Sequence, residues 1–170
     1  MNLITDLQNE KQLYLFNVKE IIIQFPHRLI NDITFRVLKA LHNNYENLNE
    51  SYKIQTYFFL EKMVSQGTVT NETTEEVVRE LISTVPIVTE SGQIIYGYMQ
   101  ALSESFINFC QFDRSKGNKY LSGIISIFQE FVIREGKIQH QATSLLQRVL
   151  TQTIDRSLWI KKQTDESEMM

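Results

Sequence analysis

The chain has 170 residues, of which 42% are hydrophobic and 22% are charged, and its formal net charge is −3. This length fits one domain, and the composition is that of an ordinary globular protein. The negative charge gives no reason to expect nucleic acid as the main partner, and 6 glycines and 2 prolines are too few for the frequent turns of an all-β fold.

The single cysteine, Cys110, cannot form an internal disulfide. The sequence does not open with the basic stretch, apolar run and small-residue cleavage site of a secretion signal, and no run of 18 apolar residues could span a membrane. We therefore expect a protein of the cytoplasm or nucleus. The sequons at Asn49 and Asn71 are accordingly interpreted as helix-start residues rather than as glycosylation sites.

Apolar residues recur at helical spacing in seven segments. These predicted helices cover residues 3–25, 27–42, 51–66, 73–85, 91–112, 118–134 and 137–158. Several of them are apolar on more than one face, which favours helices packed between neighbours on both sides. The aromatic residues fall on the same stripes and are predicted to lie in the core.

The predicted helix boundaries depend on local signals. Pro26 and Pro86 each end a helix, because the residue before a proline disfavours helical geometry. The segments 43–47 and 113–117 are predicted as loops, and Gly67 and Gly136 as the residues that end or separate helices. Residues 73–76 predict a capping box, in which the Thr73 hydroxyl accepts from the Glu76 amide and the Glu76 carboxylate reaches back.

Alternate predicted helices begin at a nearly constant spacing. The odd-numbered helices start near residues 3, 49, 91 and 137, and the even-numbered ones near 27, 73 and 115. The steps of about 42 to 46 residues fall in the range of HEAT and armadillo repeats, each of which is built on a helix pair. This spacing predicts a stack of helix pairs.

Residues 119–154 carry the clearest family resemblance. An apolar helix with the sequence YLSGIISIF over 120–128 is followed by a break at Gly136 and then by KIQHQATSLL over 137–146. This pair resembles a HEAT repeat, with Ile138, Ala142 and Leu145 where that family's second helix buries valine, alanine and leucine. The pair departs from the family in lacking the first-helix proline and the turn aspartate, and in having Gln139 where arginine is usual.

The resemblance implies a short α-solenoid of about seven antiparallel helices over residues 1–162, with a polar tail over 163–170. The alternative is a closed helical bundle. In the repeat phase set by the last pair, the segment 3–25 is the second helix of a pair whose first helix is missing. The chain is then either a piece of a longer solenoid or a small protein with an odd helix.

The sequence contains no clear catalytic, metal-binding or phosphate-binding motif. His27, His42 and His140 are not spaced as metal ligands, and Cys110 lies on an apolar helix where a buried, inert thiol is expected. Gly92 and Gly97 are not followed by the lysine of a phosphate loop. The acidic residues at 75, 76 and 80 are interpreted as a solvated face. We therefore predict no catalytic residue, metal or cofactor.

One basic cluster leaves contact with nucleic acid open as a secondary interpretation. It consists of Arg114, Lys116 and Lys119, with Arg134 and Lys137 at the other end of the same predicted helix. Because loops usually carry solvated charge, we expect these residues to be ordinary surface residues.

A non-enzymatic protein-interaction scaffold is the leading functional hypothesis. The resemblance implies roles such as transport adaptor, phosphatase scaffold, or assembly factor for ribosome or chromatin complexes, with ribosome assembly slightly favoured. One alternative is a closed bundle that binds a partner's amphipathic helix in an apolar groove, although the groove motif of such regulators is absent. A third is an enzyme whose active-site residues are dispersed along the chain.

The polar face of the last predicted helix is the candidate partner-binding surface. If the apolar stripe of this helix turns inward, four polar residues turn outward, namely Gln141, Ser144, Arg148 and Asp155. The alternative is an ordinary solvated helix face. Leu158 and Trp159 lie where a further repeat would stack, and Trp159 is a further candidate partner-binding residue. If the chain is a piece of a longer solenoid, this apolar end is expected to self-associate or to bind the missing neighbour.

Overall fold

The computed structural model describes residues 27–66, 69–87 and 89–153. Over these residues the fold is all-α and contains no strand, which confirms the predicted class. The α-helices are α3 (His27–Asn44), α4 (Glu50–Ser65), α5 (Asn71–Ser83), α6 (Gly92–Phe112), α7 (Arg114–Val132) and α8 (Lys137–Thr153), and η2 (Tyr45–Asn47) is a 3-10 helix. The predicted helix over 3–25, Gly67 and the tail over 163–170 lie outside the described residues.

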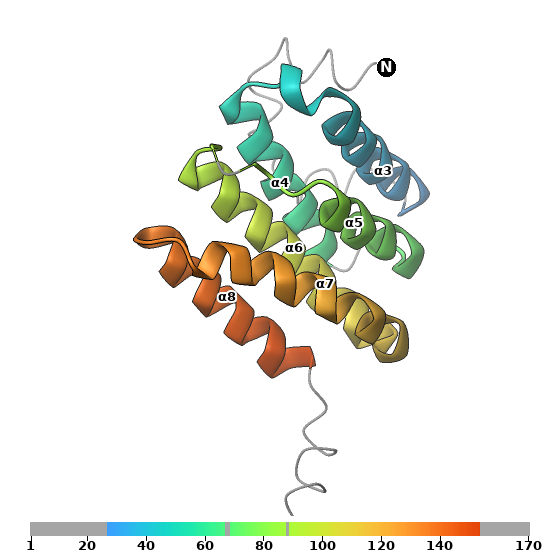
Figure 1. Ribbon diagram of the computed structural model, residues 1–170. Coiled ribbons are helices and arrows are strands. Elements are labelled where there is room, and N and C mark those ends of the chain that lie inside the picture. The colour runs from blue at the N-terminus through green and yellow to red at the C-terminus, as the bar shows by residue number, and fades with distance from the viewer. Residues whose placement is uncertain (1–26, 67–68, 88, 154–170) are drawn as a thin grey trace, which may run out of the picture.

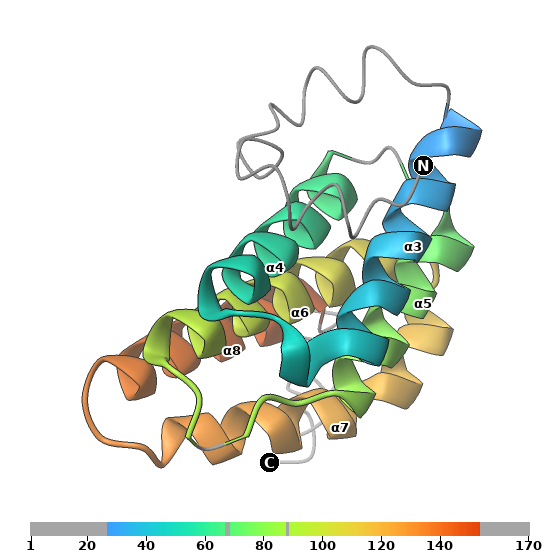
Figure 2. The ribbon, with the colours of Figure 1, turned by 90° about the horizontal axis from the view of Figure 1, so that it is seen from above.

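The helices form two rows (Figures 1 and 2). In one row α6 packs between α4 and α8, and in the other α5 lies between α3 and α7. Each of the predicted pairs thus places its first helix in one row and its second helix in the other. This arrangement agrees with the predicted pairing, whereas the relationship to HEAT repeats stays a prediction.

The centre of the core is α6, which contacts α4, α5, α7 and α8. Most of its side chains are buried, including Tyr98, Leu102 and Phe106. The Tyr98 ring packs edge-to-face between Tyr57 of α4 and Phe131 of α7, with centroid distances of 5.7 and 6.4 Å. Since edge-to-face contacts orient aromatic rings, these residues fix the positions of three helices. The predicted placement of the aromatic stripes in the core is confirmed for these residues.

Side chains placed just before the helices cap several of them. The Asn49 side chain accepts a hydrogen bond from the Tyr52 amide at 2.9 Å, and Ser91 accepts from the Ile94 amide at 3.3 Å. These side chains satisfy amides that have no partner within the helix. The helix-start interpretation of the Asn49 sequon is confirmed, and Asn71 is the first residue of α5.

The predicted capping box at Thr73 and Glu76 is wrong. The cap of α5 is Thr70, whose hydroxyl accepts from the Thr73 amide at 3.3 Å, and Glu76 instead pairs with Arg79 at 2.7 Å. The Thr70 amide also donates to the Asn31 side chain of α3 at 2.8 Å. This tertiary hydrogen bond fixes the turn before α5 three residues earlier than the local pattern suggests.

Both predicted loops are also shorter in the structure. The α3 helix continues to Asn44 and is followed by η2, and α7 begins at Arg114 directly after its cap, Asp113, which accepts from the Lys116 amide at 3.0 Å. The loops were predicted from their polar residues, but asparagine and charged residues also occur in the terminal turns of helices. The helices therefore extend into the segments that the sequence assigned to loops. Gly136 separates α7 from α8 as predicted. Its φ of 89° lies in the left-handed region, which glycine adopts readily because it has no Cβ atom.

A buried ion pair holds two connections together at one end of the rows. The Lys53 ammonium group of α4 lies 3.0 Å from the Glu90 carboxylate in the α5–α6 connection and 4.0 Å from the ring centre of Tyr45 in η2. A cation between a carboxylate and an aromatic face stabilises both contacts. Among the described residues, no helix has the length and apolar character that crossing a membrane requires.

Candidate interaction surface

The outward surface of the α4–α6–α8 row is the candidate site. Because α6 is covered by four helices, its incompletely buried residues follow one polar stripe, which includes Gln93, Tyr96, Gln100, Glu104 and Asn108. Their spacing of three to four residues places them on one helix face. We call the surface formed by this stripe and the adjoining residues of α4 and α8 the row face.

Three charged residues align across the row face. The Arg148 guanidinium group of α8 lies 2.8 Å from the Glu104 carboxylate of α6, and Glu61 of α4 interacts electrostatically with both residues. In the sequence, Glu104 follows Glu61 by 43 residues and Arg148 follows Glu104 by 44. Residues 43 and 44 positions apart in the sequence therefore lie near one another on neighbouring helices of one row, a separation within the predicted range of about 42 to 46.

The carboxyl group of Glu61 is destabilised in its charged form. Burial raises the pKa of Glu61, and the nearby Glu104 carboxylate raises it further, while Lys62 and Arg148 oppose the shift. The Lys62 ammonium group lies 3.7 Å from Glu61 and 5.3 Å from the ring centre of Phe58. The middle of the row face thus holds two carboxylates whose charge its own two cations compensate.

Hydrogen-bonding side chains surround this charged centre. The Gln100 amide donates to the Tyr96 hydroxyl at 2.8 Å, and the Asn108 amide donates to the Glu104 backbone carbonyl at 2.8 Å. Phe58 is 50% exposed one helical turn before Lys62. Amide, hydroxyl and guanidinium groups can bind peptide backbone and carboxylates, and an exposed aromatic ring adds an apolar contact.

The predicted partner-binding residues are placed on the row face where the structure describes them. Ala142 and Val149 are buried, Gln141 is partly buried, and Ser144 and Arg148 are exposed. Asp155 and Trp159 lie outside the described residues, as does Leu158. Sequence reasoning missed Glu61 and Glu104, although the spacing of 43 and 44 residues to Arg148 was a signal for them.

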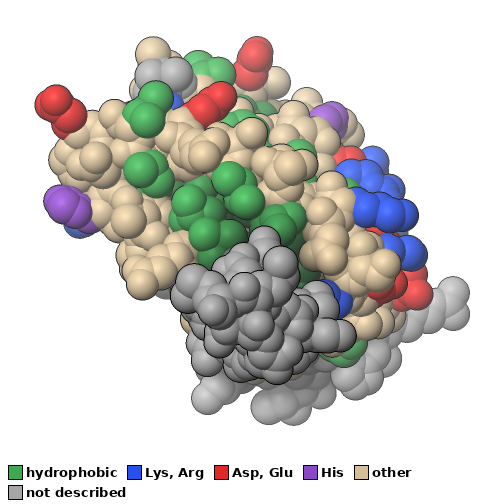
Figure 3. Space-filling model, turned by 60° about the horizontal axis from the view of Figure 1, so that its bottom comes forward, with side chains coloured by type: hydrophobic (Ala, Val, Ile, Leu, Met, Phe, Trp, Pro, Cys, Tyr) green, Lys and Arg blue, Asp and Glu red, His purple; other side chains and the backbone are tan. Residues whose placement is uncertain are grey.

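The basic cluster on α7 lies beside acidic residues of α5. The Lys116 ammonium group lies 3.9 Å from the Glu75 carboxylate, which also accepts a hydrogen bond from the Tyr120 hydroxyl at 2.8 Å. Lys119 is exposed. Figure 3 shows lysine and arginine side chains along one edge of the molecule with acidic side chains among them. The carboxylates lower the positive potential that nucleic acid would require.

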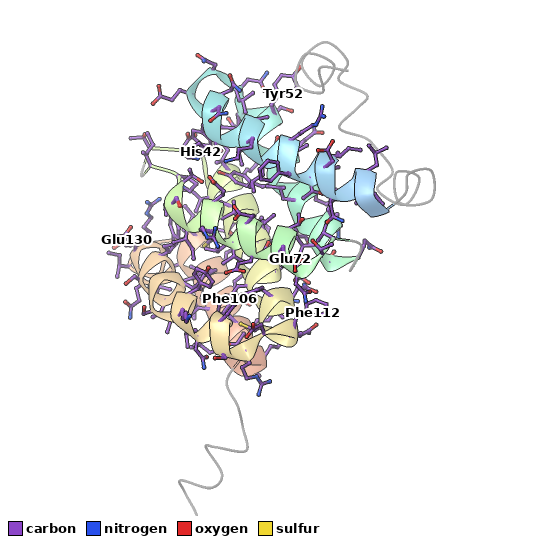
Figure 4. The ribbon with its side chains drawn as sticks, turned by 90° about the vertical axis from the view of Figure 1, so that its right-hand side faces the viewer. His42, Tyr52, Glu72, Phe106, Phe112 and Glu130 are labelled. Atoms are coloured by element: carbon purple, nitrogen blue, oxygen red, sulfur yellow. The ribbon has the colours of Figure 1, made fainter. Side chains whose placement is uncertain are left out.

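The cysteine and two of the histidines were candidates for reactive groups, and each has a defined place in the structure. Cys110 is buried, and burial raises the pKa of its thiol to about 11. His42, at the end of α3 (Figure 4), lies 3.0 Å from the Glu80 carboxylate of α5, and His140 is exposed. In the described ranges no group of three or more histidine, cysteine, aspartate or glutamate residues could hold a metal ion.

Comparisons of this chain with protein-family models, with curated proteins and with solved structures found no match. Its function is therefore inferred from its own residues.

Proposed function

We propose that the chain is a non-enzymatic protein-interaction scaffold that binds a partner along the row face. The observation that carries this proposal is the alignment of Glu61, Glu104 and Arg148 across three neighbouring helices. A row of helices offers an extended surface, and stacks of helix pairs commonly use such a surface for binding.

The side chains of the row face favour a peptide segment as the bound group. Arg148 is 43% exposed, so its guanidinium group can bind a second acceptor while Glu104 orients it. Gln100, Asn108 and Gln141 supply amides that can pair with a peptide backbone. Because each of these groups projects from a helix, the backbone that carries them is already ordered before a partner binds.

A closed bundle that binds an amphipathic helix remains the second candidate. It requires an apolar groove, whereas the row face is polar apart from Phe58 and the partly buried aliphatic residues. The two-row packing supports the scaffold instead. Small-angle scattering of the full chain distinguishes the two, since a stack of helix pairs is longer than a bundle of equal mass.

The cellular setting of the scaffold is inferred from the HEAT resemblance. The resemblance supports complexes such as those of transport adaptors or ribosome-assembly factors, and we propose the cytoplasm or nucleus as the compartment in which they act.

Partner capture with matched variants tests the role of the row face. Ser144→Glu adds a charge at an exposed position and leaves the Arg148–Glu104 ion pair in place. Arg148→Gln removes the guanidinium group and with it that ion pair. Arg36→Gln is the control, because Arg36 is also an exposed arginine paired with a carboxylate, Asp32 at 3.0 Å, but lies on α3 in the other row.

We expect Ser144→Glu and Arg148→Gln to reduce capture of the same partner at least tenfold, and Arg36→Gln to leave it unchanged. Unfolding curves must show that all three variants are folded. If the two row-face variants capture the partner as well as the parent does, the proposed surface is wrong.

A further inference from the structure

The charged groups in the middle of the row face lie at two depths. The side chains of Lys62 and Arg148 are 38% and 43% exposed, whereas those of their carboxylate partners, Glu61 and Glu104, are 17% and 16% exposed. Both cations stabilise the charged form of Glu61, so both lie close to it. A molecule that approaches the row face therefore meets an ammonium group and a guanidinium group before it meets either carboxylate.

The hydrogen-bonding groups at this point differ in the same direction. Both oxygens of the Glu104 carboxylate have a donor within the chain, since one lies 2.8 Å from the Arg148 guanidinium group and the other accepts from the Asn108 side-chain amide at 3.3 Å. A guanidinium group carries five N–H donors and an ammonium group three, and a single carboxylate cannot occupy all of them. The middle of the row face thus presents spare donors, and these donors are positively charged.

An apolar contact lies beside one of these cations. The Lys62 ammonium group lies 3.7 Å from the Glu61 carboxylate and 5.3 Å from the ring centre of Phe58, so two neighbours in α4 hold it in place. Phe58 itself is exposed. A segment that binds Lys62 can therefore also place an apolar side chain against an aromatic ring, which removes apolar surface of both partners from water.

We propose that the partner segment is acidic, with aspartate or glutamate side chains that bind Lys62 and Arg148 and an apolar side chain that packs on Phe58. This inference rests on the proposed function, because it names the partner of the same surface. Hydrogen bonds between charged groups are stronger than neutral ones, and a carboxylate matches the planar fork of a guanidinium group. A basic segment would instead have to displace the two exposed cations before it reached Glu61 and Glu104.

Glu61 makes the sign of the partner's charge measurable. Burial and the nearby Glu104 carboxylate raise the pKa of Glu61, so its charged form is already disfavoured before a partner binds. A partner carboxylate at Lys62 would add one more negative charge beside it. Glu61→Gln removes the charge and nearly keeps the shape, so it should tighten the binding of an acidic segment and weaken the binding of a basic one.

Selection of random-sequence peptides on the full chain tests the proposal. Peptides that lose binding to Ser144→Phe, which adds bulk without charge at an exposed position, are assigned to the row face. We expect these peptides to be enriched in aspartate and glutamate. Synthetic copies carry an amidated C-terminus, so that only side-chain carboxylates supply negative charge. They should bind Lys62→Gln and Arg148→Gln about tenfold more weakly and Glu61→Gln several-fold more tightly than the parent, with Arg36→Gln of α3 as the unchanged control.

Two results overturn the proposal, and they can be told apart. If no selected peptide loses binding to Ser144→Phe, the row face does not bind peptide segments, and the proposed function fails together with the proposal. If row-face peptides are found but are neutral or basic, or if Glu61→Gln fails to tighten their binding, only the acidic character of the partner is wrong. Unfolding curves establish that every variant is folded, so that a change in binding is a property of the row face.

Discussion

Gly117 of α7 packs directly against the thiol of Cys110 in α6. A Cβ atom at position 117 would overlap the Cys110 sulfur and would lie 3.5 Å from its Cβ. The two helices are joined through a single residue, Asp113, so their first and last turns have little freedom to move apart. Glycine at this position is thus a requirement of the α6–α7 junction.

Gly117→Ala should therefore destabilise the protein by about 1–3 kcal/mol, the usual cost of overpacking a core. Gly123→Ala in the same helix is the matched control, because its Cβ would lie 3.9 Å from an Ile82 methyl group, an ordinary contact. That variant should gain about 0.5–1 kcal/mol from helix propensity. Denaturant unfolding of both variants measures the difference, and equal stabilities would show that the junction relaxes freely.

Cys110 should react slowly with thiol reagents in the native protein. Its side chain is buried, and burial raises the pKa of the thiol to about 11, so little thiolate forms at neutral pH. Labelling should accelerate strongly in denaturant, where the thiol is accessible. Rapid labelling in native buffer would contradict the buried position.

Thr70→Ala should cost about 1 kcal/mol of stability, because it removes the hydroxyl that accepts from the Thr73 amide. Thr73→Ala should cost much less, since the Thr73 side chain is only partly buried in the first turn of α5 and caps no amide there, accepting instead from the Thr70 hydroxyl. Thermal or chemical unfolding of the two variants compares them directly. A larger loss of stability for Thr73→Ala would show that Thr73, as the local sequence pattern predicted, and not Thr70 is the cap of α5.

Ala142→Phe should destabilise the protein by about 1–3 kcal/mol, because Ala142 is fully buried in α8 where that helix packs on α6 and α7. Ser144→Phe, two residues along and exposed, should change stability by less than about 0.5 kcal/mol. If the order were reversed, the inward face of α8 would be misassigned, and with it the row face.

Stability should fall at alkaline pH. Burial raises the pKa of Tyr57 and of Tyr98 above 10.0, and that of Cys110 from 9.0 to about 11. The unfolded chain then ionises at lower pH than the folded one, so these groups stabilise the fold below about pH 9 and progressively lose that contribution above it. Between its pKa in the unfolded chain and its pKa in the folded chain, each group lowers the free energy of unfolding by roughly 1.4 kcal/mol per pH unit.

Tyr98→Phe isolates one of these contributions. The variant removes an ionisable group but also the hydrogen bond from the Tyr98 hydroxyl to the Leu81 carbonyl, so it should be less stable than the parent at pH 7. Its stability should nevertheless fall less steeply between pH 10 and 11. An identical slope in both proteins would show that Tyr98 does not titrate with unfolding.

The sequence by itself determined the helical class, the order and approximate extent of the six described helices, and the inward stripe of α8. Helical periodicity is a local property, because one apolar face must be buried whatever covers it. The same periodicity identified Ala142 and Val149 as inward and Ser144 and Arg148 as outward. Gly136 could be predicted as a break for a similarly local reason.

Tertiary structure alone decided the boundaries and charge pairs that depend on contacts between helices. The start of α5 follows from the Thr70 amide bonding to Asn31, 39 residues earlier, which competes with the local capping pattern. Arg148, predicted as an outward group, pairs with Glu104 because α6 and α8 pack side by side. Such pairs depend on distances between helix axes and on rotation about them, and a one-dimensional pattern specifies neither.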